Sequence, residues 1–237
     1  MLVLGFRPAR PHLNPNPNPH PHPLTIRFRN CVGDRPLLLS EGAYTNRFGE
    51  PFSVQQFKYY ISDIWIIGQE RAEERLSDEP HLVDQGDSSS LVLHLPATLS
   101  GIRSIRFVIG VDSLANVSGV QTADLDPMLG MFWTWNTGYI DARLEGISDS
   151  AHSPAHRFTW DIGGYKGTQN AVRQITLTIP GADQTSAENM IPITADLLKW
   201  FDGKQPIRIA HSPVCHQPGS LAMQIADNYS TMFSVEP

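Results

Sequence analysis

Short runs in which apolar and polar residues alternate recur along this chain, and they constrain its fold more than any other feature. Residues 24–29, 91–95 and 172–179 follow this period of two, which is typical of strands that bury one face. Gly- and Pro-rich turns separate such runs. Many short strands with this punctuation predict a single all-β domain, a Greek-key β-sandwich of immunoglobulin-like shape.

The remaining elements are expected as follows. Further strands are predicted at residues 57–67, 102–109, 158–162 and 190–193, and a strand or strand pair at 133–144 with a break at Gly138. Residues 71–86 and 111–130 are predicted as loops. Short helices near the C-terminus are predicted at 195–201 and 220–229.

Composition excludes several classes of protein. Hydrophobic residues make up 41% and charged residues 18% of the chain, which favours a globular domain over a disordered one. The net charge of −6 provides no basic surface for nucleic acid. No apolar stretch is long enough to span a membrane. Residues 1–23, rich in Pro, Asn and His, are expected to be a disordered spacer, which leaves 24–237 as the folded domain.

One segment, residues 125–146, contains two of the five tryptophans. In an extended strand Met131, Trp133 and Trp135 would project from the same face. Such a face is either a core layer or a place where a soft metal or an oxidant is handled. The residue types alone leave both interpretations open.

This segment resembles the signature of the methanobactin-associated copper-binding protein family (MbnP-like domains), a GM-x-W-x-W-x-x-GYI-x-x-x-LEG core after an LDP turn. Four further stretches resemble family motifs in the same order: FKYYISD at 57–63, IGVDSLAN at 109–116, IGG-x-x-G at 162–167 and IADNYSTMF at 225–233. The resemblance implies an exported, periplasmic or cell-surface protein that binds Cu(I). It also implies that a partner dihaem enzyme, similar to cytochrome c peroxidases, oxidises a tryptophan to kynurenine, and Trp135 is favoured over Trp133. Because no signal peptide is visible, an export signal or lipid anchor is expected upstream of the given start.

Candidate copper ligands lie mainly in the C-terminal third. His211 and His216 flank Cys215 in a Pro-rich segment, and imidazole, thiol and thioether groups suit Cu(I). A polar loop with chance donors is the alternative. Asp161 is a further candidate, because many relatives carry His at this position, although a carboxylate suits Cu(I) poorly. His216 is therefore the best imidazole candidate, with Met131 as a thioether candidate.

Other residues allow several roles. Cys31 and Cys215 could form a disulfide, remain buried thiols, or, for Cys215, bind a soft metal. Asp112 and Asp126 could bind calcium through hard oxygens, or could simply form turns. No motif of a known catalytic site is present, so a non-enzymatic protein is expected. A cell-surface interaction module that has lost metal binding is the alternative function.

Overall fold

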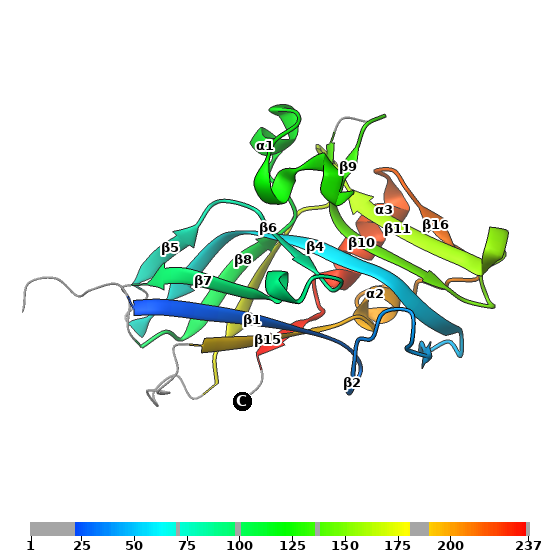
Figure 1. Cartoon of the computed structure of the whole chain (residues 1–237), viewed down its shortest axis with the longest axis horizontal. Coiled ribbons are helices and arrows are strands. Elements are labelled where there is room, and N and C mark those ends of the chain that lie inside the picture. The colour runs from blue at the N-terminus through cyan, green and yellow to red at the C-terminus, as the bar shows by residue number, and fades with distance from the viewer. Residues whose placement is uncertain (1–21, 70–71, 98–100, 136–137, 181–189, 236–237) are drawn as a thin grey trace, which may run out of the picture.

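The computed structural model describes residues 22–69, 72–97, 101–135, 138–180 and 190–235. The expected N-terminal spacer therefore lies outside the described residues as far as residue 21. The chain is mostly β-strand with a few short helices, as predicted, and Figure 1 shows α1 and β9 projecting from one side of the body. The Greek-key connectivity stays a prediction.

The larger sheet is built around the 17-residue strand β4 (Pro51–Ile67). Its main path runs β14 (Arg173–Thr178), β8 (Ser104–Ile109), β4, β10 (Gly138–Ile147), β11 (Arg157–Gly163) and β16 (Val214–Cys215). The short strands β3 (Tyr44–Thr45), β5 (Glu73–Ser77) and β6 (His81–Asp84) also pair with β4, and β9 (Phe132–Trp133) pairs with β10.

The smaller sheet contains strands from both the N-terminal and the C-terminal parts of the domain. Its path runs β17 (Phe233–Val235), β15 (Met190–Asp196), β1 (His22–Val32) and β2 (Arg35–Pro36), with β7 (Val92–Ala97) also on β1. Strands β1 and β15 are parallel. The main core lies between the sheets, where Tyr59 of β4 contacts both Phe28 of β1 and Phe233 of β17 through edge-on ring contacts.

The short helices were only partly predicted. Helix α3 (Ser220–Tyr229) has the predicted bounds. The helix expected at 195–201 shrinks to α2 (Lys199–Asp202), because β15 continues to Asp196 and Leu197 N–H donates to the Cys31 carbonyl. The expected loop at 111–130 contains α1 (Ser113–Val117) and the 3-10 turns η3 (Ala123–Leu125) and η4 (Pro127–Leu129). Turns η2 (Ser88–Leu91) and η5 (Pro154–His156) and the β12 (Tyr165–Lys166)–β13 (Gln169–Asn170) hairpin complete the described elements.

The prediction of a loop at 71–86 was wrong, because this region forms β5 and β6. Strand β5 pairs with β4 through the backbone while its own side chains are largely charged. Strand β4 extends beyond the residues that pair with β10, and β5 pairs with this extension. The strand forms through these backbone hydrogen bonds, since its own sequence has no apolar pattern.

A second, smaller core lies on the other face of the larger sheet. Tyr59 belongs to the main core, whereas the next residue, Tyr60, belongs to the second core, as expected for neighbours on a strand. The second core is closed by residues 111–135, which we call the apolar lobe. The buried members of the second core are Tyr60, Leu82, Val111, Leu125, Met131, Trp133, Tyr139 and Ile140.

Among the described residues, no helix has the length and apolar character needed to cross a membrane.

Candidate metal centre

Strand β9 and the start of β10 position the two tryptophans of the signature segment. Gly138 pairs with Trp133, and Tyr139 pairs with Phe132. Strand β9 ends at Trp133, and the chain then turns. The prediction that Met131, Trp133 and Trp135 share one strand face was therefore wrong for Trp135. Met131 and Trp133 are buried in the second core, whereas Trp135 is 62% exposed. The two indoles nevertheless remain in contact, with ring centroids 5.7 Å apart.

Trp133 packs against the glycine turn that follows β11. A Cβ atom at Gly163 would lie 2.5 Å from the Tyr139 carbonyl oxygen and 3.0 Å from the Trp133 ring, so only glycine fits between them. The Trp133 indole N–H is buried and has no hydrogen-bond partner in the described structure. The same ring lines a small pocket of about 90 Å³. Its other lining residues are Gly138, Tyr139, Gly164, Tyr165, Lys166, Gln169 and Pro218.

His216 and Asp161 meet because β16 pairs in parallel with β11. Cys215 lies opposite Trp160, so the residue after each of them also falls side by side. The distance from His216 Nδ1 to Asp161 Oδ2 is 3.4 Å. Two of the predicted ligands are thus brought together, one from a half-exposed side chain and one from a side chain that is 8% exposed.

Asp161 is already engaged by a cation. Arg143 lies opposite Asp161 in the β10–β11 register. Its guanidinium donates from Nε to Oδ1 at 2.6 Å and from Nη2 to Oδ2 at 3.0 Å. Such a two-point pair neutralises the carboxylate and fixes its orientation. The sequence analysis did not identify Arg143, although an opposite charge on each of two neighbouring strands rich in apolar residues indicates such a pair.

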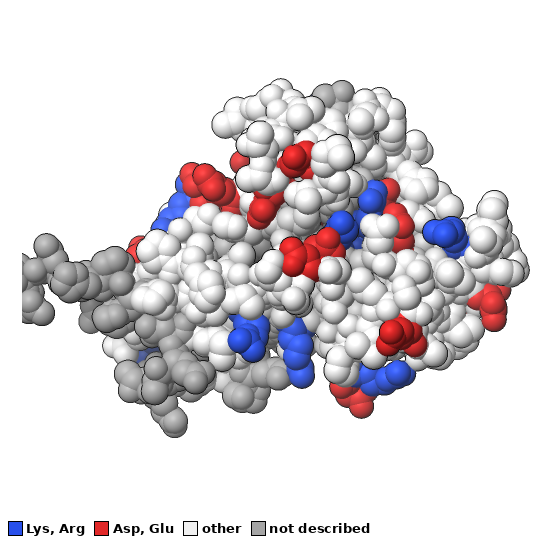
Figure 2. Space-filling view, in the orientation of Figure 1, with Lys and Arg blue, Asp and Glu red and all other residues white. Residues whose placement is uncertain are grey.

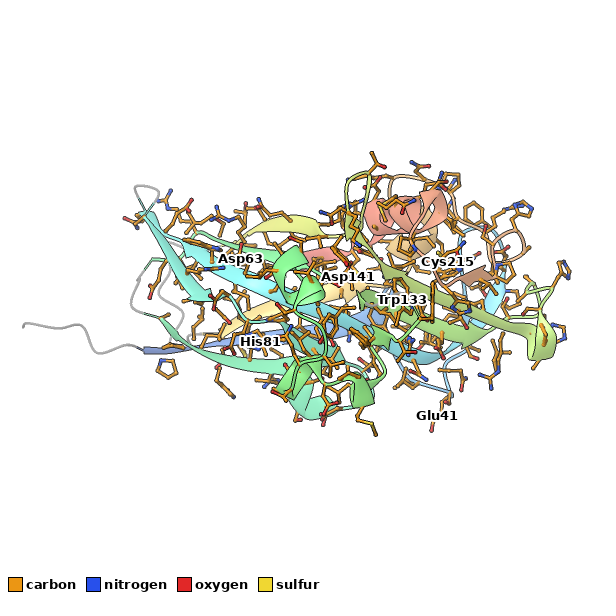
Figure 3. All side chains as sticks on the ribbon, turned by 90° about the horizontal axis from the view of Figure 1, so that it is seen from above. Glu41, Asp63, His81, Trp133, Asp141 and Cys215 are labelled. Carbon is orange, nitrogen blue, oxygen red and sulfur yellow. The ribbon has the colours of Figure 1, made fainter. Side chains whose placement is uncertain are left out.

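Cys215 lies beside this pair but is poorly suited as a ligand at neutral pH. The thiol is buried, and burial raises its pKa to about 11, so it is protonated near pH 7. Cys31 lies in the other sheet, and the two cysteines do not form the disulfide that was one of the alternatives. Figure 3 shows Trp133 and Cys215 in the same half of the molecule, with Asp63 toward the opposite end.

The remaining candidates lie apart from this pair or have other contacts. His211 is exposed in a turn that its backbone N–H closes onto the Arg208 carbonyl. Asp112 caps α1 by accepting from Ala115 N–H, and Asp126 caps η4 by accepting from Met128 N–H, as the turn alternative predicts. Within the described ranges, no three His, Cys, Asp or Glu side chains are placed to hold a metal ion together.

The arrangement joins a signature tryptophan, a glycine turn and a His–Asp pair on neighbouring strands, and it can be compared with known proteins. The family model for MbnP matches residues 21–217. The chain belongs to the MbnP family. Among solved structures, it resembles MbnP from Methylosinus trichosporium with a TM-score of 0.56 and 14% sequence identity, covering 84% of this chain and 83% of the other. No curated protein matches it. The resemblance drawn from the motifs is thereby confirmed, and the similar structure supports the fold of this MbnP member.

Proposed function

We propose that this MbnP-family chain is an exported, non-enzymatic copper-binding protein whose Cu(I) site combines His216 with an oxidised tryptophan. The observation that supports it best is a series of contacts that leads from the tryptophan pair to strand β11, which carries Asp161. Trp135 contacts Trp133, and Trp133 packs on Gly163. Gly163 lies two residues after Asp161, the residue that faces His216.

The unmodified side chains fit Cu(I) poorly. His216 offers a suitable imidazole, but Asp161 is a hard oxygen donor already paired with Arg143, and Cys215 is a protonated thiol. Indole offers no accessible lone pair, whereas kynurenine carries an aniline nitrogen and a ketone oxygen. Copper binding in this proposal therefore depends on the modification.

Trp135 is the proposed site of oxidation because it is the exposed member of the indole pair. An oxidant that cannot enter the second core can still reach this ring. A partner dihaem enzyme in the periplasm or at the cell surface is the proposed source of the oxidising equivalents. Trp133 is the alternative site, since its ring packs against Gly163, two residues after Asp161.

A second function is favoured by one specific contact. The Arg143 guanidinium occupies the position where a metal would need the Asp161 oxygens, and it places a positive charge there. In this alternative the chain is a cell-surface interaction module without a metal.

The experiment is to export the protein with and without a co-expressed dihaem enzyme similar to cytochrome c peroxidases, then map oxidised peptides and titrate Cu(I) against a competing chelator. A kynurenine at Trp135, with tight stoichiometric Cu(I) only after co-expression, supports the proposal. His216→Gln should abolish tight binding, and His94→Gln, at an exposed position on β7 where the side chain hydrogen-bonds Thr25, should leave it intact. Oxidation without copper binding would favour the second function. The absence of both tryptophan oxidation and tight copper binding would refute the first.

A further inference from the structure

The apolar lobe exposes an unusual share of large apolar side chains. Nine such side chains are exposed in the described part of the chain, and six of them belong to the lobe. Met128 is 90% exposed and Leu114 is 72% exposed. The other four are Val117, Val120, Leu129 and Trp135. Exposed apolar groups concentrated in this way mark interaction surfaces, whereas isolated ones do not.

The lobe is held in a defined conformation by buried polar contacts. Asn116 of α1 donates to the Val111 carbonyl at 2.9 Å and accepts from Tyr139 N–H at 2.8 Å. The Tyr139 hydroxyl donates to the Leu125 carbonyl at 3.0 Å, and the Tyr60 hydroxyl donates to the Asp124 carbonyl at 2.9 Å. These bonds tie Asn116 and Leu125 to β10, and Asp124 to β4. A surface ordered before binding loses less entropy when a partner docks.

The inner face of the lobe already accounts for its role in folding. Leu125, Met131 and Trp133 close the second core over the larger sheet. Leu114, Val117 and Met128 contribute nothing to that core and face solvent instead. Their exposure is not required to cover the sheet, so it calls for a separate explanation.

The charge around the lobe is one-sided. The sequence has no Lys or Arg between Arg106 and Arg143, and the lobe itself contains Asp112, Asp124 and Asp126. Figure 2 shows the projecting part of the molecule as largely uncharged, with carboxylates at its base and no Lys or Arg on it in this view. Two cations lie against the lobe: Lys58 beside Leu129, and Arg143 beside Gly130.

Both of these cations are neutralised. Lys58 donates to the Leu129 carbonyl and pairs with Asp84 at 2.9 Å, and Arg143 pairs with Asp161. A third cation, Lys166 of β12, lines the pocket beside Trp133, with its Nζ 5.0 Å from the centroid of the Tyr165 ring. The lobe is thus an apolar surface whose three carboxylates, Asp112, Asp124 and Asp126, outnumber this one cation.

We infer that the outer face of the apolar lobe docks a protein partner whose contact area is apolar and bordered by Lys or Arg residues. Complementary charge fixes this choice of occupant. A second copy of the chain would bring the same carboxylates against each other, and an anionic membrane surface would be repelled. The inference deepens and rests on the proposed function, because Trp135 is one of the six exposed side chains of the lobe and an oxidising partner must reach it.

The probe for the test is mitochondrial cytochrome c, a small protein with an apolar haem edge ringed by lysines. Isotope-labelled cytochrome c is titrated with the unmodified, metal-free chain at low ionic strength, and binding is followed by NMR chemical-shift changes. Saturable, salt-sensitive binding is expected, with shifts confined to the haem edge. Weak affinity is sufficient, because encounters of redox proteins bury small areas.

Two variants separate the apolar and the electrostatic contributions. Leu114→Ser with Met128→Ser removes apolar contact, and Asp112→Asn with Asp126→Asn removes charge while an Asn side chain can still cap each helical turn. Each pair should weaken binding by about fivefold or more. Leu38→Ser, at a residue outside the lobe that is 51% exposed, is the matched control and should leave affinity unchanged.

Several outcomes would overturn the inference: no saturable binding, equal affinity for all variants, self-association that the Leu114/Met128 variant abolishes, or preferential binding to anionic vesicles. The titration uses neither copper nor an oxidised residue. Failure of the copper proposal therefore leaves its result unaffected, and failure of docking leaves the copper titration unaffected.

Discussion

Replacing Arg143 by Met tests how much the ion pair with Asp161 stabilises the fold. The Asp161 side chain is only 8% exposed and that of Arg143 is 14% exposed, so the pair is largely removed from water. Without Arg143, the Asp161 carboxylate loses both charge-assisted hydrogen bonds and lies near Glu145, whose Oε1 is 3.5 Å from Arg143 Nε. Breaking a buried pair costs roughly 3–5 kcal/mol.

The lower end of that range applies here, because His216 lies 3.4 Å from Asp161 and can donate to it. A loss of about 3 kcal/mol corresponds to a fall in Tm of about 6–12 °C for a chain of this size. Urea unfolding followed by tryptophan fluorescence gives the free energy of unfolding. The matched control is Arg143→Met with Asp161→Leu, which removes both charges and should recover most of the loss. If the free energy of unfolding of Arg143→Met lies within about 1 kcal/mol of the wild-type value, the reasoning is refuted, because an unpaired carboxylate buried this deeply should cost more.

Three further predictions concern a tightly packed glycine, Gly163, and two buried titratable groups, Asp141 and Cys215. Gly163→Ala should lower the free energy of unfolding by about 2 kcal/mol, because its Cβ would meet the Tyr139 carbonyl oxygen. Gly219→Ser, at the N-cap of α3 with no atom within 4 Å of the new Cβ, should be nearly neutral in the same urea titration. Burial raises the pKa of Asp141 well above its usual range, so the folded state holds a proton that the unfolded chain releases above about pH 4. The free energy of unfolding should therefore fall as pH rises from about 4. Asp141→Asn should remove this pH dependence in unfolding curves measured across the range. The Cys215 thiol should react with a disulfide reagent at about pH 8 only as fast as the protein unfolds, because it is buried with a pKa of about 11, and rapid labelling of the native protein would contradict its placement.

Periodicity predicted the strands that bury one face and missed those held by backbone pairing alone. The run at 172–179 appears as β14, and the first strand appears as β1. Strand β5, with the sequence EERLS, carries no apolar alternation and forms because β4 offers it unpaired backbone groups. A helix propensity near residue 195 gave way to pairing between β1 and β15 for the same reason.

The residue types in the sequence suggested candidate ligands, but they could not predict how these residues are arranged. His216 and Asp161 were both selected as ligands, but their contact depends on the parallel register of β11 and β16, which no local pattern encodes. The exposure of Trp135 depends on where β9 stops, and that end falls after a single pair of residues. The sequence could indicate which groups matter to a soft metal, and only the fold shows that one of them is already held by Arg143.

Strand β10 explains why the lobe and the candidate metal centre are arranged together. A bulge between Ile140 and Ala142 shifts the pairing of β10 with β11 at Asp141. Before the bulge, Tyr139 and Ile140 face the second core and anchor the lobe; after it, Ala142 faces the main core. A bulge inserts one residue and bends the strand, so one strand can serve both cores. Asp141, the inserted residue, accepts Val111 N–H at 2.9 Å and thereby fixes the first residue of the lobe. A change at this bulge should therefore move the lobe and the Trp133 ring together. Such a movement would couple partner docking to the geometry of the proposed copper site.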